Sequence, residues 1–108
     1  MRLYELSTME RGWFVGDFKP VALRTEACEV AVKRYKAGTQ DEPHIHRIAT
    51  EVTLLLSGEA RVNGVKVKKG TIFVIDAGEA TTFEALSDTE TVVVKLPSIS
   101  NDKYPVEK

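Results

Sequence analysis

Residues 38–51 of the sequence read GTQDEPHIHRIATE and contain both histidines of the chain, His44 and His46. Because the two histidines are two residues apart, their rings project from one face of an extended backbone. Glu51 opens the strand-like run that follows, where its carboxylate can approach the same point from across the ladder. Two imidazoles and one carboxylate that converge in this way form a ligand set for a divalent transition metal, with coordination positions left open.

The same residues also allow a plainer interpretation. Short His-x-His pairs are common on protein surfaces, so the pair could lie in a polar loop. Glu51 would then be an ordinary carboxylate at a strand edge. The residues around this stretch decide between the two interpretations.

From residue 27 onward the sequence reads as short strand-like runs separated by turn signals, with no sustained helical periodicity. Val, Ile, Thr, Leu and Phe are frequent in every run, as is typical of strands. Asn63-Gly64 predicts a two-residue hairpin turn, because Asn and Gly tolerate the positive φ that both central positions require. The sequence therefore predicts an all-β protein with strands in the ranges 27–36, 51–57, 59–62, 65–68, 71–75, 81–86 and 89–96.

Several of these runs are apolar on both faces, so something must cover each face. In residues 51–57, Leu55 lies at an odd position, while Leu54 and Leu56 lie at even ones. One face would line a barrel, and the other needs a second sheet, the aromatic segment 12–18 or a second copy of the chain. We expect one domain over residues 1–108, with an N-terminal arm at 1–26, a barrel core at 27–96 and an extended or partly ordered tail at 97–108.

The composition is that of one folded globular domain, since 43% of the 108 residues are hydrophobic and 29% are charged. With 15 basic and 16 acidic residues the formal net charge is -1, and no basic block could hold nucleic acid. No apolar run is long enough to span a bilayer, and the N-terminus lacks the apolar core of a secretory signal. Cys28 is the single cysteine, as in proteins of reducing compartments. We expect a cytoplasmic location, with neither nucleic acid nor membrane as a partner.

Together with the glycine that follows it, the opening stretch resembles the first signature motif of the cupin superfamily. That motif is a glycine, five residues, His-x-His, three or four residues, a glutamate, six residues and a glycine. Every fixed position is present, in Gly38, His44, His46, Glu51 and Gly58. The resemblance implies a double-stranded β-helix, the jelly-roll barrel of cupins. It also implies that both histidines and the glutamate bind one divalent metal ion, which could be Fe, Mn, Ni, Zn or Cu.

The second cupin motif is only partly present. Gly70 and Gly78 are in register, but Asp76 stands at the proline position, Thr81 at the histidine position and Ala85 at the asparagine position. In the family that histidine is the fourth metal ligand. A neutral hydroxyl is a poor ligand for borderline metals, so the metal would have three protein ligands here.

Strand alternation extends the predicted site. If Glu51 points inward, so do Thr53 and Leu55, and an inward-pointing Thr81 is accompanied by Phe83. These four residues would give a pocket with an apolar wall and two hydroxyl groups, which suits a small organic ligand. Leu55 and Phe83 could equally be plain core residues.

Two functions are compatible with such a site. The first is a metal-dependent enzyme acting on a small organic or sugar-like molecule, of the isomerase, epimerase or dioxygenase type found among small cupins. The second is a non-catalytic module that binds or senses a small molecule. Proton transfer would need a base other than the ligands, and only Tyr35, Glu79 and Glu84 are available as candidates. The resemblance also implies a homodimer.

Overall fold

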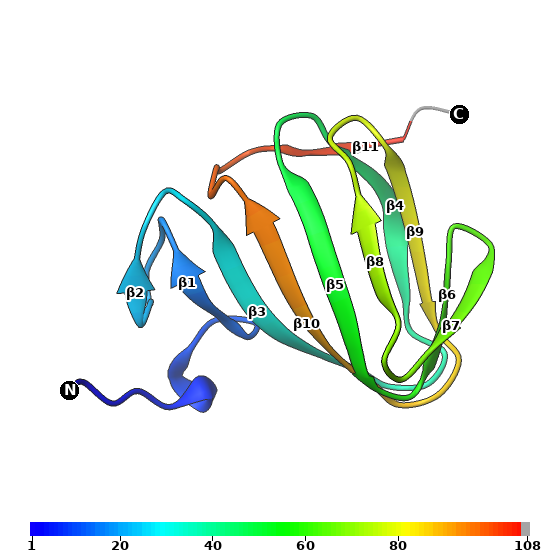
Figure 1. Ribbon diagram of the computed structural model, residues 1–108, viewed down its shortest axis with the longest axis horizontal. Helices are drawn as coiled ribbons and strands as arrows, with labels where there is room; N and C mark the ends of the chain where they lie inside the picture. Colours follow the sequence, from blue (N-terminus) through cyan, green and yellow to red (C-terminus); the bar gives the residue numbers. More distant parts are fainter. Residues whose placement is uncertain (107–108) are drawn as a thin grey trace.

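The computed structural model describes residues 1–106, which fold into strands arranged in two facing layers (Figure 1). The described helical structure is a single short 3-10 turn, η1 (Leu6–Thr8). The all-β prediction is confirmed. The strands are β1 (Trp13–Gly16), β2 (Leu23–Arg24), β3 (Glu29–Tyr35), β4 (Gln40–His46), β5 (Thr50–Ser57), β6 (Glu59–Val62), β7 (Val65–Lys68), β8 (Ile72–Ile75), β9 (Ala80–Ala85), β10 (Thr89–Leu96) and β11 (Lys103–Pro105).

The chain passes repeatedly from one sheet to the other. The first sheet is six-stranded, in the order β2-β1-β3-β10-β5-β8, and the second is five-stranded, in the order β11-β4-β9-β6-β7. Strands β4 and β5 are consecutive in the chain but belong to different sheets. The short loop at residues 47–49 therefore carries the chain from the predicted histidine ligands in one layer to the predicted carboxylate ligand in the other.

The hydrophobic core lies between the sheets. Strand alternation produces it: in β5, Thr53 and Leu55 are buried, whereas Leu56 is exposed. Burial of a Leu or Phe side chain contributes about 1.5–3 kcal/mol to folding. The core cluster consists of Leu55, Ala60, Val62, Phe83 and Ala85.

Two turns show why glycine is needed where the sequence has it. The predicted hairpin is present, with φ of 48° at Asn63 and 78° at Gly64. Gly58, the last glycine of the first motif, has φ of +84°, and a Cβ there would lie 2.2 Å from the carbonyl oxygen of Asp88. A side chain at this position would collide with backbone, so the close approach of the two loops requires glycine.

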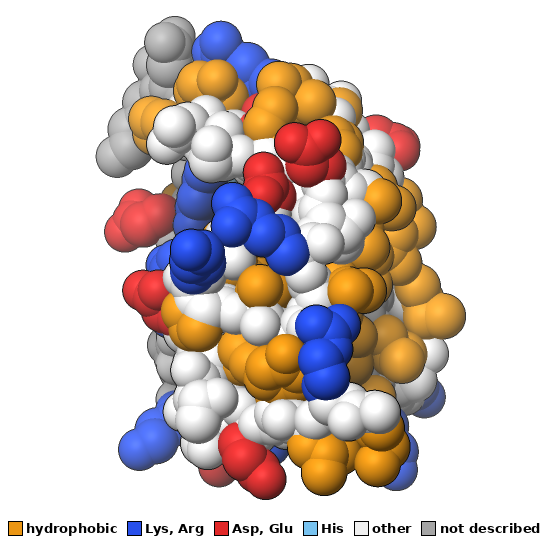
Figure 2. Space-filling model, turned by 90° about the vertical axis from the view of Figure 1, so that its left-hand side faces the viewer, with side chains coloured by type: hydrophobic (Ala, Val, Ile, Leu, Met, Phe, Trp, Pro, Cys, Tyr) orange, Lys and Arg blue, Asp and Glu red, His pale blue; other side chains and the backbone are white. Residues whose placement is uncertain are grey.

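The outer face of the six-stranded sheet is aliphatic, as the two-sided apolar pattern predicted. Cross-strand pairing aligns its side chains in rows that run over β3, β10, β5 and β8. Figure 2 shows hydrophobic side chains gathered along the side of the molecule that this face forms. The two rows are Val32, Val92, Leu54 and Ile72, and Val30, Val94, Val52 and Val74.

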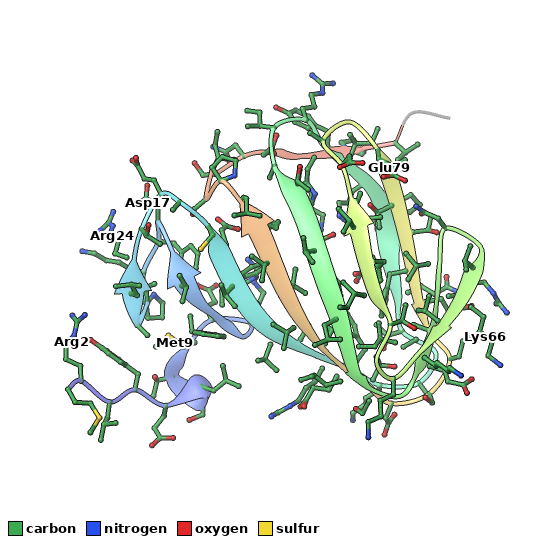
Figure 3. All side chains as sticks on the ribbon, viewed as in Figure 1. Arg2, Met9, Asp17, Arg24, Lys66 and Glu79 are labelled. Atoms are coloured by element: carbon green, nitrogen blue, oxygen red, sulfur yellow. The ribbon has the colours of Figure 1, made fainter. Side chains whose placement is uncertain are left out.

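The aromatic segment 12–18 does not cover this face. Its residues Trp13–Gly16 form β1 instead, which pairs with β3 and so widens the sheet at its edge. The first residues of the chain extend away from the strands, as the position of Arg2 shows (Figure 3). Of the three candidates for covering this face, the segment 12–18 is therefore excluded, because its backbone hydrogen bonds go to the open edge beside β3.

The segment after Pro97 contributes β11, which pairs antiparallel with β4. Lys103 is aligned with His46 and Pro105 with His44. The expected extended tail is thus a strand beside the predicted histidine ligands. The division of the chain into arm, barrel and tail stays a prediction. The described residues contain no helix with the length and hydropathy that a membrane span requires.

Candidate metal and ligand site

The three predicted metal ligands line one cleft. His44 and His46 lie at the end of β4, and Glu51 lies near the start of β5. All three face a cleft of about 970 Å³ with walls from β3, β5 and β10 of one sheet, β4 of the other, and residues near both ends of the chain. Two residues of one strand and one residue of the facing sheet therefore meet at the same cavity, as the sequence predicted.

The two imidazoles are close neighbours. Their ring centroids are 4.9 Å apart, and the ring planes cross at 80°. His44 Nδ1 lies 3.1 Å from the carbonyl oxygen of Glu42. Because a carbonyl oxygen only accepts, Nδ1 carries the proton, and Nε2 keeps a free lone pair. A backbone carbonyl that fixes the tautomer in this way is typical of metal-binding histidines.

His46 is only 5% exposed, and its Nδ1 is buried without a hydrogen-bond partner. A buried polar atom left unpaired costs about 1–3 kcal/mol, and a metal ion would provide the missing partner. The residue types and this orphaned nitrogen therefore fit a divalent transition metal. As the side chains stand, no three His, Cys, Asp or Glu residues within 1–106 are arranged to hold a metal ion.

A smaller cavity of about 40 Å³ adjoins the ligands and is lined by Thr53, Thr81 and Phe83, as well as by His44 and Glu51. Three of the four predicted pocket residues thus lie at the site. The fourth, Leu55, is 1% exposed and belongs to the hydrophobic core instead. Its side chain points inward as predicted, but Leu55 lies two residues beyond Thr53 along β5, where the interior of the barrel is filled by core residues.

Thr81 lies beside the histidines. It is aligned with His44 across β4 and β9, is 4% exposed, and its hydroxyl has no hydrogen-bond partner. Glu79 and Glu84 line neither cavity. Glu79 accepts a hydrogen bond from the backbone of Asp76, and Glu84 forms an ion pair with Arg61. Neither carboxylate therefore offers a ligand oxygen in place of the histidine that Thr81 replaces.

The comparisons with known proteins rest on structure. No protein-family model and no curated protein matches the sequence. An uncharacterized conserved protein with a double-stranded β-helix domain from Klebsiella pneumoniae is 23% identical, with a TM-score of 0.70 over 78% of this chain and 74% of that one. KdgF from Halomonas sp. is 18% identical, with a TM-score of 0.67 over 71% of this chain and 74% of that one.

Oxalate decarboxylase from Bacillus subtilis is 22% identical, with a TM-score of 0.67 over 75% of this chain and 24% of that one. The chain therefore corresponds to about a quarter of that enzyme, which has Mn(II) centres. The double-stranded β-helix seen in these structures is the arrangement of strands described above. The chain has the cupin fold. The fold predicted from the first motif is thus confirmed, including the jelly-roll barrel.

The surroundings of the cleft shift the pKa values of two predicted metal ligands. Burial lowers the pKa of His46 to about 4, with repulsion by Lys95 and His44 acting in the same direction. Burial also raises the pKa of Glu51, although Lys95 and His44 partly oppose the rise. Since an imidazole must be neutral to bind a metal, His46 is ready to bind one over a wider pH range than an exposed histidine.

We expect the metal-free protein to lose stability as the pH falls from about 6.5 to about 4. In this window the unfolded chain protonates His46 and the folded chain does not, so acid favours unfolding, by up to about 3 kcal/mol. The raised pKa of Glu51 acts in the opposite direction. The measurement is therefore the difference in unfolding free energy between wild type and His46→Gln at several pH values. A difference that does not change with pH would contradict the neutral, buried imidazole.

The loop between the histidines and Glu51 is held by the C-terminal segment of the cupin barrel. The Asp102 carboxylate accepts hydrogen bonds from the backbone N–H groups of Arg47 (3.1 Å), Ile48 (3.1 Å to each oxygen) and Ala49 (2.9 Å). Burial alone would raise the pKa of Asp102, but these donors outweigh it and hold the pKa below its usual value. Asp102 thereby fixes the path of the chain between the predicted ligands.

Several residues of the site were not among those predicted. Asp41 lines both cavities, while Trp13, Lys33 and Lys95 line the larger one. Alternation from the buried Ala31 in β3 and Val93 in β10 would have placed the two lysines on the inner face. Sequence reasoning passes over them because lysine normally points to solvent.

Tyr35 was one of the candidates for a base. Burial raises its pKa, and the carboxylates of Asp41 and Glu51 raise it further. A phenol in this environment stays protonated near neutral pH. Tyr35 can therefore donate a hydrogen bond to a ligand in the cleft, but it is a poor proton acceptor.

Proposed function

We propose that this cupin binds one divalent transition metal through His44, His46 and Glu51 and uses it to bind a small organic molecule in the cleft. The observation that carries the proposal is the buried, unpartnered Nδ1 of His46 beside His44 and Glu51 in one cavity. The Mn(II) centres of oxalate decarboxylase, which has the same fold, support a metal at this place. A bound metal would act as a Lewis acid with coordination positions open to the ligand.

The residues around the ligands would orient the bound molecule. The protonated hydroxyl of Tyr35 and the hydroxyls of Thr53 and Thr81 offer donors at the smaller cavity. Phe83 and Phe73 provide its apolar wall. A reaction of the isomerase, epimerase or dioxygenase type is the activity we propose for this arrangement.

A non-catalytic binding module is the second candidate, and two observations favour it. Thr81 occupies the place of the fourth ligand and leaves its hydroxyl unpartnered. The raised pKa of Tyr35 removes one of the three candidate bases, and the other two, Glu79 and Glu84, do not line the cleft. Without a base among the three predicted candidates, the site can bind a ligand without turning it over.

The test is a calorimetric titration of metal-free protein with Mn²⁺, Fe²⁺, Ni²⁺, Cu²⁺ and Zn²⁺, followed by NMR screening of small sugars and organic acids with the loaded protein. One metal site per chain supports the proposal, and product formation identifies an enzyme. Ligand binding without product formation identifies the binding module. Failure of all five ions to bind would overturn the metal-dependent function and leave only a metal-free binding module.

We also propose that two copies associate through the outer face of the six-stranded sheet. Both aliphatic rows on this face end in β8 at the sheet edge, where Ile72 is 64% exposed and Val74 is 51% exposed. A continuous apolar surface of this kind marks an interaction site.

Replacing Ile72 by Lys is expected to convert the dimer to a monomer in sedimentation equilibrium, because a buried charge would face its symmetry mate. The control is Thr82→Lys at an exposed position of β9 in the other sheet. A wild-type protein that stays monomeric, or a dimer that tolerates Lys at position 72, would contradict the proposed interface.

The single free cysteine, Cys28, supports a cytoplasmic location as part of the same proposal.

A further inference from the structure

Three lysines from three different strands line the cleft that holds the proposed metal ligands. They are Lys33 of β3, Lys95 of β10 and Lys103 of β11. The ammonium groups of Lys33 and Lys95 lie 5.0 Å and 4.9 Å from the ring centroid of Trp13. The indole ring thus holds two cations at the wall of the cleft.

Strand register places two of these lysines directly beside the proposed ligands. Lys95 is aligned with Glu51 across β10 and β5, and Lys103 is aligned with His46 across β11 and β4. Both lysines contribute to the electrostatic environment of His46 and Glu51. The positive charges therefore lie next to the metal ligands and not at a distant part of the surface.

Carboxylates neutralise only part of this charge. Lys95 forms an ion pair with Glu29 at 3.3 Å, and the Ser98 hydroxyl donates a hydrogen bond to Glu29. Lys33 donates only to the backbone carbonyl oxygen of Arg11, at 2.9 Å. Among residues 1–106, neither Lys33 nor Lys103 forms an ion pair with a carboxylate.

The positive charges also repel one another. Burial lowers the pKa of Lys33, and the charges of Arg11, Lys95 and Lys103 lower it further, whereas Asp41 opposes them. A half-buried ammonium group among other cations is unfavourable in the empty cleft. An anion bound between them would relieve the repulsion and would exchange water for charge-assisted hydrogen bonds.

We infer that the ligand of this cleft is a small organic anion whose acidic group lies between Lys33 and Lys103, against Trp13, with its other end at the metal. The inference rests on the proposed function for the metal end only. The acidic group is a carboxylate or a phosphate, since ammonium groups bind both as point charges. The carboxylates of Glu29 and Asp41 also line the cleft and would repel a second negative charge on the ligand.

The test is calorimetric titration of metal-free and Mn²⁺-loaded protein with succinate, inorganic phosphate and the neutral diamide succinamide. Lys33→Met and Lys103→Met each remove one charge from the cleft. Lys66→Met is the matched control, because Lys66 projects from the β6–β7 hairpin at the far end of the molecule (Figure 3). Lys103 is exposed, so its replacement tests the inference even if Lys33→Met fails to fold.

Succinate or phosphate is expected to bind at least about tenfold more weakly to Lys103→Met and Lys33→Met than to wild type, and Lys66→Met is expected to bind like wild type. Tighter binding of succinate than of phosphate identifies a carboxylate ligand, and the reverse identifies a phosphate ligand. Equal binding of succinamide, equal losses in all three variants, or no binding of either anion would overturn the inference.

The two proposals fail in different ways. Lysine-dependent anion binding in a protein that takes up no metal would leave the inference standing and remove the proposed metal function. Metal binding without any anion binding would remove the inference alone.

Discussion

Replacing His44 and His46 together by alanine is expected to weaken binding of a divalent metal by at least about a hundredfold. Loss of an outer partner of a metal ligand already costs about 10–100-fold in affinity, and this variant loses two of three direct ligands. The measurement is titration of the metal-free double variant with Mn²⁺ and Zn²⁺ beside wild type. Circular dichroism checks that the barrel stays folded, because removing the buried His46 leaves a cavity.

Glu51→Gln tests the carboxylate separately. It keeps the shape of the side chain while removing the charge, and Glu79→Gln removes a carboxylate that lines neither cavity. We expect the first to weaken metal binding and the second to leave it unchanged. If the His44→Ala, His46→Ala double variant binds metal as tightly as wild type, the metal lies elsewhere.

Asp102→Ala is expected to lower the free energy of unfolding by about 3 kcal/mol and to weaken metal binding about tenfold. The substitution leaves three backbone N–H groups of the loop at residues 47–49 without their charged acceptor. A hydrogen bond to a charged group contributes about 1.5–3 kcal/mol, and water satisfies part of the loss. Metal affinity falls because the loop joins His46 to Glu51. Urea unfolding and metal titration measure the two effects.

The sign of the pH dependence follows from the lowered pKa of Asp102. The stability that the carboxylate contributes is complete above the ordinary pKa of about 3.9 and is lost as the pH falls through the lower folded value. The stability gap between wild type and Asp102→Ala should therefore close in strong acid.

Asp88→Ala is the matched control for Asp102, because Asp88 also accepts a hydrogen bond from a loop N–H group, that of Ala37, at 2.9 Å. Its loop lies outside both cavities. This control should lose some stability and keep its metal affinity. An Asp102→Ala variant that binds metal as tightly as wild type would show that the loop does not position the ligands.

Local patterns predicted the parts of the structure that depend on local rules. Asn63-Gly64 specifies its turn because both residues accept positive φ. Alternation from Glu51 correctly placed Thr53 on the inner face of β5, and the spacing of the first motif predicted that His44, His46 and Glu51 would share a cavity. Each of these predictions follows from residues close together in the sequence.

The parts that were missed depend on contacts between distant residues. Asp102 lies in the C-terminal segment, whose two prolines and polar residues predict only an extended tail. It accepts hydrogen bonds from N–H groups that lie 53 to 55 positions earlier in the chain. The segment 12–18 was one candidate for covering a sheet face, but it instead forms backbone hydrogen bonds with the free edge of β3. Lys33 and Lys95 face the cleft because Trp13 and Glu29 stabilise them there. Alternation alone gives the inward direction of these lysines, but the contacts that stabilise them there come from distant parts of the chain.

The central claim is that this cupin barrel holds one divalent metal through His44, His46 and Glu51. Elemental analysis of protein purified without an affinity tag, in parallel with the His44→Ala, His46→Ala double variant, tests it most directly. We expect about one equivalent of a single transition metal per wild-type chain and none in the variant. No metal in the wild type and none taken up from solutions of iron, manganese, nickel, copper or zinc, or equal metal in the double variant, would contradict it.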